Sequence, residues 1–231
     1  MKPSGKTAPS ATPLPSRRSE PRWPALLALI AIGALERALP PQLDVGPGWL
    51  ILVTVLVLAV PTVLARRVGY HKLDRVLGYA MNAIVTLALI GSLGLLVLSL
   101  PRHTVPPAQL LKVAAVLWTS NVLVFASWYW RLDAGGPTER DLRESHTDGA
   151  FLFPQMSLPD SLAESMRAAR GGKNWSPDFV DYLFLAFMSS MAFSPTDVPV
   201  LSRWAKGLMM VQSSVSLLTI ALLAARAVNI L

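Results

Sequence analysis

The sequence of 231 residues contains no cysteine, which excludes disulfides, thiolate metal sites and cysteine-based catalysis. It is also poor in charge, since Asp, Glu, Lys and Arg make up 15% of the chain. Hydrophobic residues account for 52%, and the mean hydropathy is +0.45. An ordinary soluble domain carries about 25% charged residues. The chain is therefore too apolar for a soluble domain, and we predict a membrane protein.

Motifs of enzymatic and nucleic-acid chemistry are missing as well. There is no Gly-x-Ser-x-Gly, no His/Glu spacing suited to a metal, and no pair of carboxylates within an apolar segment. The polar residues deep in those segments are Asn, Ser, Thr and Gln, which are poor acid–base groups. We therefore predict no enzyme, no catalytic or metal-binding residues and no cofactor. Nucleic acid is not an expected partner, because no basic, aromatic-rich soluble domain is present.

The sequence contains five long apolar blocks, at residues 23–39, 49–65, 76–100, 108–130 and from about 202 onward. A hydrocarbon core of roughly 30 Å takes about 20 helical residues to cross. Helices satisfy their own backbone polar groups in lipid, and no period-two alternation favours a barrel. We predict an all-α, multi-pass membrane protein with membrane lipids as its partner. Its bundle has five full transmembrane helices plus a short helix, at about 179–191, that either crosses or re-enters.

Composition divides the chain into four regions. Residues 1–22 are rich in Pro, Ser and basic residues, so we expect a disordered tail rather than a signal peptide, because no small-x-small cleavage pattern follows promptly. Residues 23–131 form a four-helix transmembrane region. Residues 132–177 are a polar loop with an amphipathic helix at about 158–170, and residues 178–231 form a helical hairpin.

The loop 66–75 gives the strongest orientation signal, because four of its ten residues are Lys or Arg. By the positive-inside rule this loop lies in the cytoplasm. His71, within it, is expected to be solvated. The block 108–130 has only Lys112 near its start, which excludes a voltage sensor built from regularly spaced basic residues.

The polar loop gathers several carboxylates around one histidine: Glu139, Asp141, Glu144, His146 and Asp148. A metal or acid–base site is one interpretation of this cluster. A solvated charged loop accounts for it equally well and is the interpretation we favour. Phe151 and Phe153 follow, and we expect them to dip into the membrane interface.

The hairpin holds the candidate functional residues. Asp178 and Asp181 open its short helix and complement the helix dipole. A polar break follows, and its residues are candidates for a constriction: Phe193, Ser194, Pro195, Thr196 and Asp197. Polar residues inside the spans are candidates for lining a pathway or for packing helices together: Gln212, Ser213, Ser216, Asn82 and Asn121.

The hairpin resembles the pore module of two-helix potassium channels, through Tyr182-Leu-Phe-Leu-Ala-Phe187, Ser194-Pro-Thr-Asp197-Val198 and Arg203-Trp-Ala-Lys206. In that family an aromatic pore helix runs into Thr-Val-Gly-Tyr-Gly-Asp, and an inner helix follows a basic residue. The resemblance places residues 192–196 on the filter. Ser194 and Thr196 replace its glycines and Pro195 fixes the backbone between them, so potassium selectivity is not expected.

Residues 24–231 more closely resemble a family of small bacterial inner-membrane proteins of unknown function. Its C-terminal signature runs from Tyr-x-Ser-Phe through Ser-Asp-Val to Ala-Val-Asn. Asp197-Val198 and Ala227-Val228-Asn229 match the later parts of that signature. This resemblance implies a bacterial source and a location in the inner (plasma) membrane.

Two functions stay open at this point. In the first, a homo-oligomer forms a weakly selective ion pore, and a ring of Asp197 carboxylates attracts inorganic cations. In the second, a non-conducting membrane scaffold or sensor keeps the hairpin as a packing unit. Charge counts favour a short helix that crosses completely, which gives six spans with Arg203 and Lys206 as exceptions.

Overall fold

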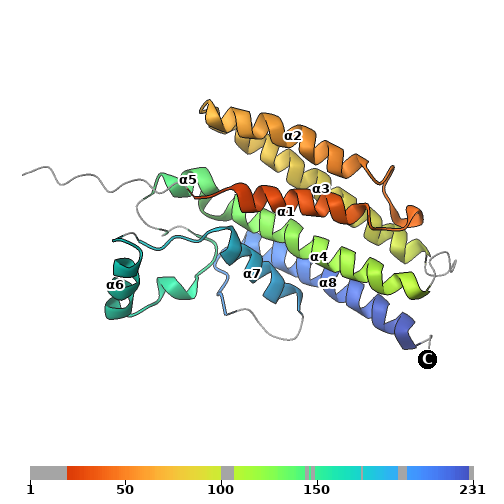
Figure 1. The fold of residues 1–231 in the computed structure, drawn as a ribbon. Helices are drawn as coiled ribbons and strands as arrows, with labels where there is room; N and C mark the ends of the chain where they lie inside the picture. Colours follow the sequence, from red (N-terminus) through yellow and green to blue (C-terminus); the bar gives the residue numbers. More distant parts are fainter. Residues whose placement is uncertain are drawn as a thin grey trace, which may run out of the picture.

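The computed structural model describes residues 20–99, 107–143, 146, 149–172, 174–191 and 197–228 (Figure 1). Its α-helices are α1 (Trp23–Glu36), α2 (Leu50–Arg67), α3 (His71–Ser99), α4 (Pro107–Leu132), α5 (Pro137–Asp141), α6 (Asp160–Ala169), α7 (Phe179–Ser190) and α8 (Arg203–Val228). Short 3-10 turns lie between some of them: η1 (Pro41–Leu43), η2 (Asp133–Gly135) and η3 (Pro154–Met156). These described residues confirm the predicted all-α class.

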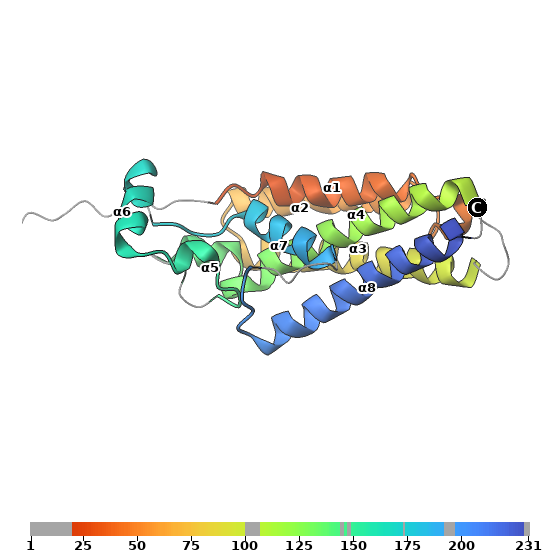
Figure 2. The same cartoon turned by 90° about the horizontal axis from the view of Figure 1, so that it is seen from below.

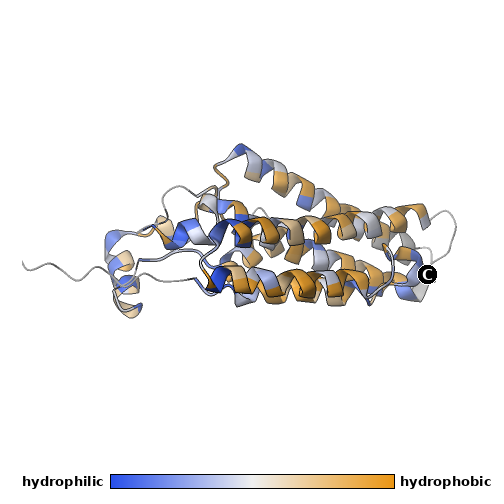
Figure 3. Ribbon diagram, turned by 90° about the horizontal axis from the view of Figure 1, so that it is seen from above, coloured by the Kyte–Doolittle hydropathy of each residue, from blue (hydrophilic) through white to orange (hydrophobic). Residues whose placement is uncertain are grey.

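The helices α1, α2, α3, α4 and α8 run along one long axis and form the bundle (Figures 1 and 2). Within the described ranges, four of them are long and apolar enough to cross a membrane, namely α2, α3, α4 and α8. Helix α1 has 14 residues, fewer than the roughly 20 that a full span requires, so a fifth full span is not confirmed. Figure 3 shows apolar residues along the bundle and hydrophilic ones gathered at the end with α5 and α6.

Large apolar side chains cover the outside of the bundle. Val57 and Val60 of α2 and Met210 and Leu217 of α8 are each exposed over more than half of their surface. A soluble monomer rarely exposes so much apolar surface without a partner to cover it. Such outward faces are compatible with helices that contact lipid.

Two glycines shape the first three helices, one at a turn and one at a contact between helices. Gly69 has a φ of +84° and forms the tight turn between α2 and α3. His71 is therefore the first residue of α3 rather than part of a long loop, although it is exposed as expected. At Gly33 of α1, an added Cβ would lie 2.8 Å from the Cα of Leu52, so α1 and α2 approach closely there.

The helices α7 and α8 of the hairpin start at the same end of the bundle (Figure 2). At the start of α7, the Tyr182 hydroxyl donates to Asp133, which follows the last residue of α4. At the end of α7, Ser190 lies against the middle of α4. The chain then returns to the first end, where the Leu201 amide donates to the carbonyl of Ala150 at 2.8 Å. Helix α8 runs from there along the whole bundle.

The 12 residues of α7 rise about 18 Å, which is about three-fifths of a hydrocarbon core of roughly 30 Å. The start of α7 and the start of α8 thus lie at the same end of the bundle, an arrangement expected of a re-entrant helix. The six-span alternative stays a prediction. Arg203 and Lys206 in the first turn of α8 lie at the same end of the bundle as the basic loop 66–75.

The polar region packs onto this same end. Phe151 and Phe153 are 0% and 3% exposed, and their rings contact Tyr182; Phe151 also contacts Trp204. Their side chains are thus covered by α7 and α8 rather than turned outward, and the expectation that the segment dips into the membrane interface stays a prediction. The amphipathic helix α6, preceded by Pro159, lies beyond the end of the bundle and buries none of its residues.

The N-terminal tail ends earlier than its composition indicates. Residues 1–19 lie outside the described part, but Glu20 is only 7% exposed. Arg22 forms ion pairs with Asp74 at 3.2 Å and with Asp141 at 3.0 Å. Their polar composition alone predicts disorder. The partners of Arg22 lie more than fifty residues away in the sequence, so composition does not reveal them.

Candidate functional site

The first candidate site is the carboxyl end of α7, which stops inside the bundle. The last four carbonyl groups of a helix have no partners within that helix, and hydrocarbon supplies no water to replace them. Side chains of α4 and α8 donate to two of these carbonyl groups, those of Ser189 and Ser190, and to that of Ala186 just before them. We call these three carbonyl groups, the side chains that bind them, and Asn121, which donates to Ser190 and Gln212, the α7 cap.

Gln212 of α8 is the centre of the α7 cap and is fully buried. Its Nε2 donates to the carbonyl of Ala186 at 2.6 Å and to Ser190 Oγ at 2.7 Å. Its Oε1 accepts a hydrogen bond from the hydroxyl of Tyr129 on α4. Both halves of the amide therefore have partners, and one side chain joins all three helices.

Three further side chains bind carbonyl groups of the cap. The Ser216 hydroxyl and the Trp118 indole N–H, the latter at 3.3 Å, donate to the carbonyl of Ser190. The Ser213 hydroxyl donates to the carbonyl of Ser189 at 3.2 Å. The carbonyl end of α7 is thereby closed by neighbouring helices of the same subunit.

The two candidate asparagines differ in their surroundings. Asn121 belongs to the cap, because its Nδ2 donates to the backbone carbonyl of Gln212 at 3.3 Å. Asn82 lies elsewhere on α3; it is fully buried, and neither side-chain atom has a hydrogen-bond partner. Thr86 shares its face of the helix as the spacing predicts, but bonds to the backbone carbonyl of Asn82 and to Trp128.

Replacing each asparagine by leucine separates these two environments, since leucine is similar in size and branching. Asn121→Leu removes cap hydrogen bonds and should lower the free energy of unfolding by about 1–2 kcal/mol. Asn82→Leu removes an unpaired buried amide and should leave the stability unchanged or raise it. Thermal unfolding of the purified variants in detergent measures both. Equal losses at the two positions would contradict the assignment of Asn121 to the cap.

The predicted constriction lies mostly outside the described part of the chain. Residues 192–196, which include Phe193, Ser194, Pro195 and Thr196, are not described. Asp197 is described and is exposed, just before the chain rejoins the end of the bundle. Of the predicted pathway or packing residues, four come together in the cap and Asn82 does not.

A second site, which the sequence did not indicate, lies where α4 ends. We call it the ionic cluster; its members are Glu20, Trp130, Asp133, Arg140, His146 and Tyr182. Arg140 is 6% exposed and donates to the backbone carbonyls of Trp130 at 2.8 Å and of Asp133 at 3.0 Å. A guanidinium at the carboxyl end of a helix satisfies open carbonyls and complements the helix dipole.

Glu20 is the counter-ion of Arg140, with 2.9 Å between Oε2 and Nη2. Its other carboxylate oxygen accepts from the indole N–H of Trp130. Burial raises the pKa of Glu20, and the charge of Arg140 opposes that shift. This pair fixes the residues before α1 to the end of α4.

Asp133 is the acidic centre on the other side of Arg140 and is fully buried. Its carboxylate accepts from the Tyr182 hydroxyl and from the Ala150 amide. His146 Nε2 lies 3.2 Å from the same carboxylate, without the direction of a hydrogen bond. The guanidinium of Arg140 lies over the Tyr182 ring, 5.1 Å from its centroid. The cluster thus ties α4, α5 and α7 together.

The solvated-loop interpretation of residues 139–148 is therefore wrong for two of its members. Asp141 pairs with Arg22, and His146 is buried. Glu139 fits the interpretation, since its pair with Arg75 is exposed. Among the residues that the structure describes, which leave out Glu144 and Asp148, no three carboxylate or histidine side chains come together to hold a metal.

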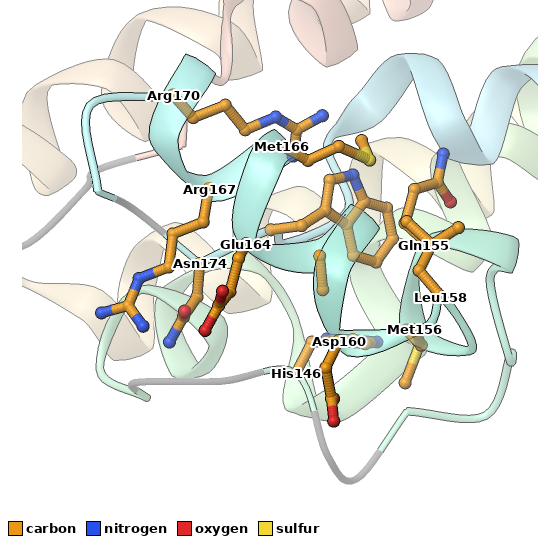
Figure 4. A pocket seen from close by; sticks show the side chains of 12 residues that line it. His146, Gln155, Met156, Leu158, Asp160, Glu164, Met166, Arg167, Arg170 and Asn174 are labelled. Carbon is orange, nitrogen blue, oxygen red and sulfur yellow. The ribbon is translucent and has the colours of Figure 1, made fainter.

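A pocket of 610 Å³ lies beneath α6 (Figure 4). Leu158, Met166 and Trp175 give it apolar walls, and His146, a member of the ionic cluster, also lines it. Its volume falls within the roughly 300–1,000 Å³ typical of small-molecule sites. Acidic and basic side chains both line it, so the lining does not select one class of ligand.

The ionic cluster escapes sequence reasoning because its pairs are far apart in the chain. Glu20 and Arg140 are separated by 120 positions, and Asp133 and Tyr182 by 49. The available signal is that charged residues stand at the ends of apolar blocks, which does not tell which of them will meet.

Comparisons with protein-family models, with curated proteins and with solved structures give no match to this chain. The fold and its long apolar helices are consistent with an integral, multi-pass membrane protein, and this is the class they define. The resemblances to two-helix potassium channels and to a bacterial inner-membrane family stay predictions.

Proposed function

We propose that this protein is a non-conducting integral membrane protein, a scaffold or sensor, in which the re-entrant hairpin is a packing unit. The α7 cap is the observation that supports this proposal. In a cation pore, the carbonyl end of a re-entrant helix faces the ions, because the negative end of the helix dipole stabilises them. Here the carbonyls of Ala186 and Ser190 accept hydrogen bonds from Gln212, Ser216 and Trp118 instead.

The same proposal places the end of the bundle with α5 and α6 in the cytoplasm. Basic residues gather there, including Arg66, Arg67, Lys72, Arg75, Arg140, Arg203 and Lys206. The described residues at the opposite end include three basic ones, Arg37, Lys112 and Arg226. The positive-inside rule then assigns the first end to the cytoplasm. The pocket beneath α6, next to the ionic cluster, is then within reach of cytoplasmic partners, as a scaffold or sensor requires.

Ion flux through the purified protein in liposomes tests the proposal. We expect potassium and sodium flux equal to that of protein-free liposomes, with a reconstituted channel as the positive control. Gln212→Leu, which opens the α7 cap, should stay silent as well, since the cap is a packing device and not a gate. Flux above the background in the wild-type protein would overturn the proposal.

A second function, a weakly selective pore within a homo-oligomer, is supported by the layout of the hairpin. Helices α4, α7 and α8 follow the order of outer helix, re-entrant helix and inner helix in two-helix potassium channels. The exposed Asp197 would then line a path between subunits. Flux that falls in Asp197→Asn and persists in Gln212→Leu would favour this function over the first.

A further inference from the structure

Glu36, the last residue of α1, is an acid buried among apolar helices. This residue is 1% exposed. It is the one charged residue of a helix that is otherwise apolar after Trp23 and Pro24. The hydroxyl of Ser92 on α3 donates to its Oε2 at 3.2 Å. Its Oε1 is buried and has no hydrogen-bond partner. An acidic side chain in such a place is costly, which makes it a candidate for function.

The charged groups around Glu36 do not neutralise it. Within the described residues it forms no ion pair, and its neighbour Arg37 is exposed. On α4, the nearest basic residue toward this end is Lys112, which is exposed as well. Helix α2 starts at this end with apolar residues and carries its arginines at the other.

A second carboxylate, that of Asp44, lies beside this position. A Cβ added at Gly48 would be 2.8 Å from Asp44 Oδ2 and 3.9 Å from the Cα of Arg37, so Asp44 lies against the end of α1. Asp44 is half-buried and follows η1, so its carboxylate is more accessible to solvent than that of Glu36. The apolar blocks contain no carboxylate pair because Asp44 belongs to a loop outside them.

We propose that Glu36 is a proton-binding site, held as the neutral acid, with Asp44 as the group through which protons reach it from the surface. An ionised carboxylate without a cation in an apolar interior costs several kcal/mol, and a second carboxylate nearby adds repulsion. A neutral acid avoids both penalties and keeps the hydrogen bond from Ser92. The site is separate from the hairpin and does not depend on whether the protein conducts.

Labelling with dicyclohexylcarbodiimide tests the proposal, because this reagent modifies protonated carboxyl groups in apolar surroundings. The purified full-length protein is treated across a pH series, and the adduct is located by mass spectrometry. We expect modification at Glu36 that declines as the pH rises, and no adduct on that peptide in Glu36→Gln. In Asp44→Asn the decline should move to lower pH, because a like charge has been removed.

Two results would overturn the proposal. One is the absence of an adduct at Glu36 at every pH. The other is protection of Glu36 by sodium or potassium at constant pH, which would show a carboxylate that holds a metal cation instead. Infrared difference spectra between acidic and alkaline samples provide a second readout on wild type and Asp44→Asn, so the test does not depend on the folding of Glu36→Gln. They should contain a C=O band that persists above the pH range in which exposed carboxyl groups titrate, and this band should disappear at lower pH in Asp44→Asn than in wild type.

Discussion

Replacing Gln212 by leucine should lower the free energy of unfolding by about 2–3 kcal/mol. The change leaves the Tyr129 hydroxyl without its acceptor inside the bundle and takes one donor each from the carbonyl of Ala186 and from Ser190. An unsatisfied buried group costs roughly 1–3 kcal/mol in a soluble protein, and an interhelical hydrogen bond in a membrane contributes about 0.6 kcal/mol on average. For a chain of this length, the midpoint of thermal unfolding should fall by roughly 5–10 °C.

Ser214→Ala is the matched control, because Ser214 lies two positions further along the same helix and is exposed. Its hydroxyl bonds to the carbonyl of Met210 within α8, so its removal should change the stability by less than about 0.5 kcal/mol. Hydrogen exchange adds a local readout: amides in the last turn of α7 should exchange faster in Gln212→Leu and not in Ser214→Ala. A Gln212→Leu variant as stable as wild type would refute the α7 cap.

Replacing Arg140 by methionine should destabilise the protein by about 3–5 kcal/mol, the usual cost of removing one member of a buried ion pair. The side chains of Arg140 and Glu20 are 2% and 9% exposed, so the carboxylate left behind stays buried. The backbone carbonyls of Trp130 and Asp133 lose their donor as well. The measurement is unfolding of the detergent-solubilised protein by heat or by denaturant.

The control is Arg75→Met, which breaks a pair of similar chemistry with Glu139 at 2.7 Å. Because both side chains of that pair are more than 40% exposed, the loss should stay below about 1 kcal/mol. In the double variant Glu20→Gln/Arg140→Met the unpaired charge is gone, so its loss should be smaller than the sum of the two single losses. Strict additivity would mean that Glu20 and Arg140 do not act as a pair.

The helices themselves follow closely from the sequence. The predicted short helix at 179–191 appears as Phe179–Ser190, and the block at 108–130 appears within Pro107–Leu132. Local chemistry accounts for this agreement: Asp178 and Asp181 form a capping box at the start of α7, and Pro159 precedes α6. The predicted start of α3 is too late, because charged residues were assigned to a loop. The helix begins at His71, inside the predicted basic loop.

The sites could be predicted less well from the sequence, because they depend on contacts between distant segments. Gln212 was recognisable as unusual, since a long polar side chain stands in an apolar helix. Its partners on α4 and α7 were not recognisable, because periodicity gives the face of a helix and not its neighbour. Glu20 and His146 were assigned to solvated segments, since burial of a charge depends on a counter-ion or aromatic shell that only the folded chain provides.

By itself the sequence determined the class of protein and the extent of its helices, because hydropathy, proline and capping residues act over a few turns. It left open whether the short helix crosses or re-enters. The tertiary structure decided that the start of α7 and the start of α8 lie at the same end of the bundle, that four of five candidate polar residues gather at the carboxyl end of α7, and that Glu36 is left with an unpaired oxygen. The polar residues gather where α4, α7 and α8 meet, and Glu36 lies where α1 meets α3. The free energy of such contacts is absent from any one segment.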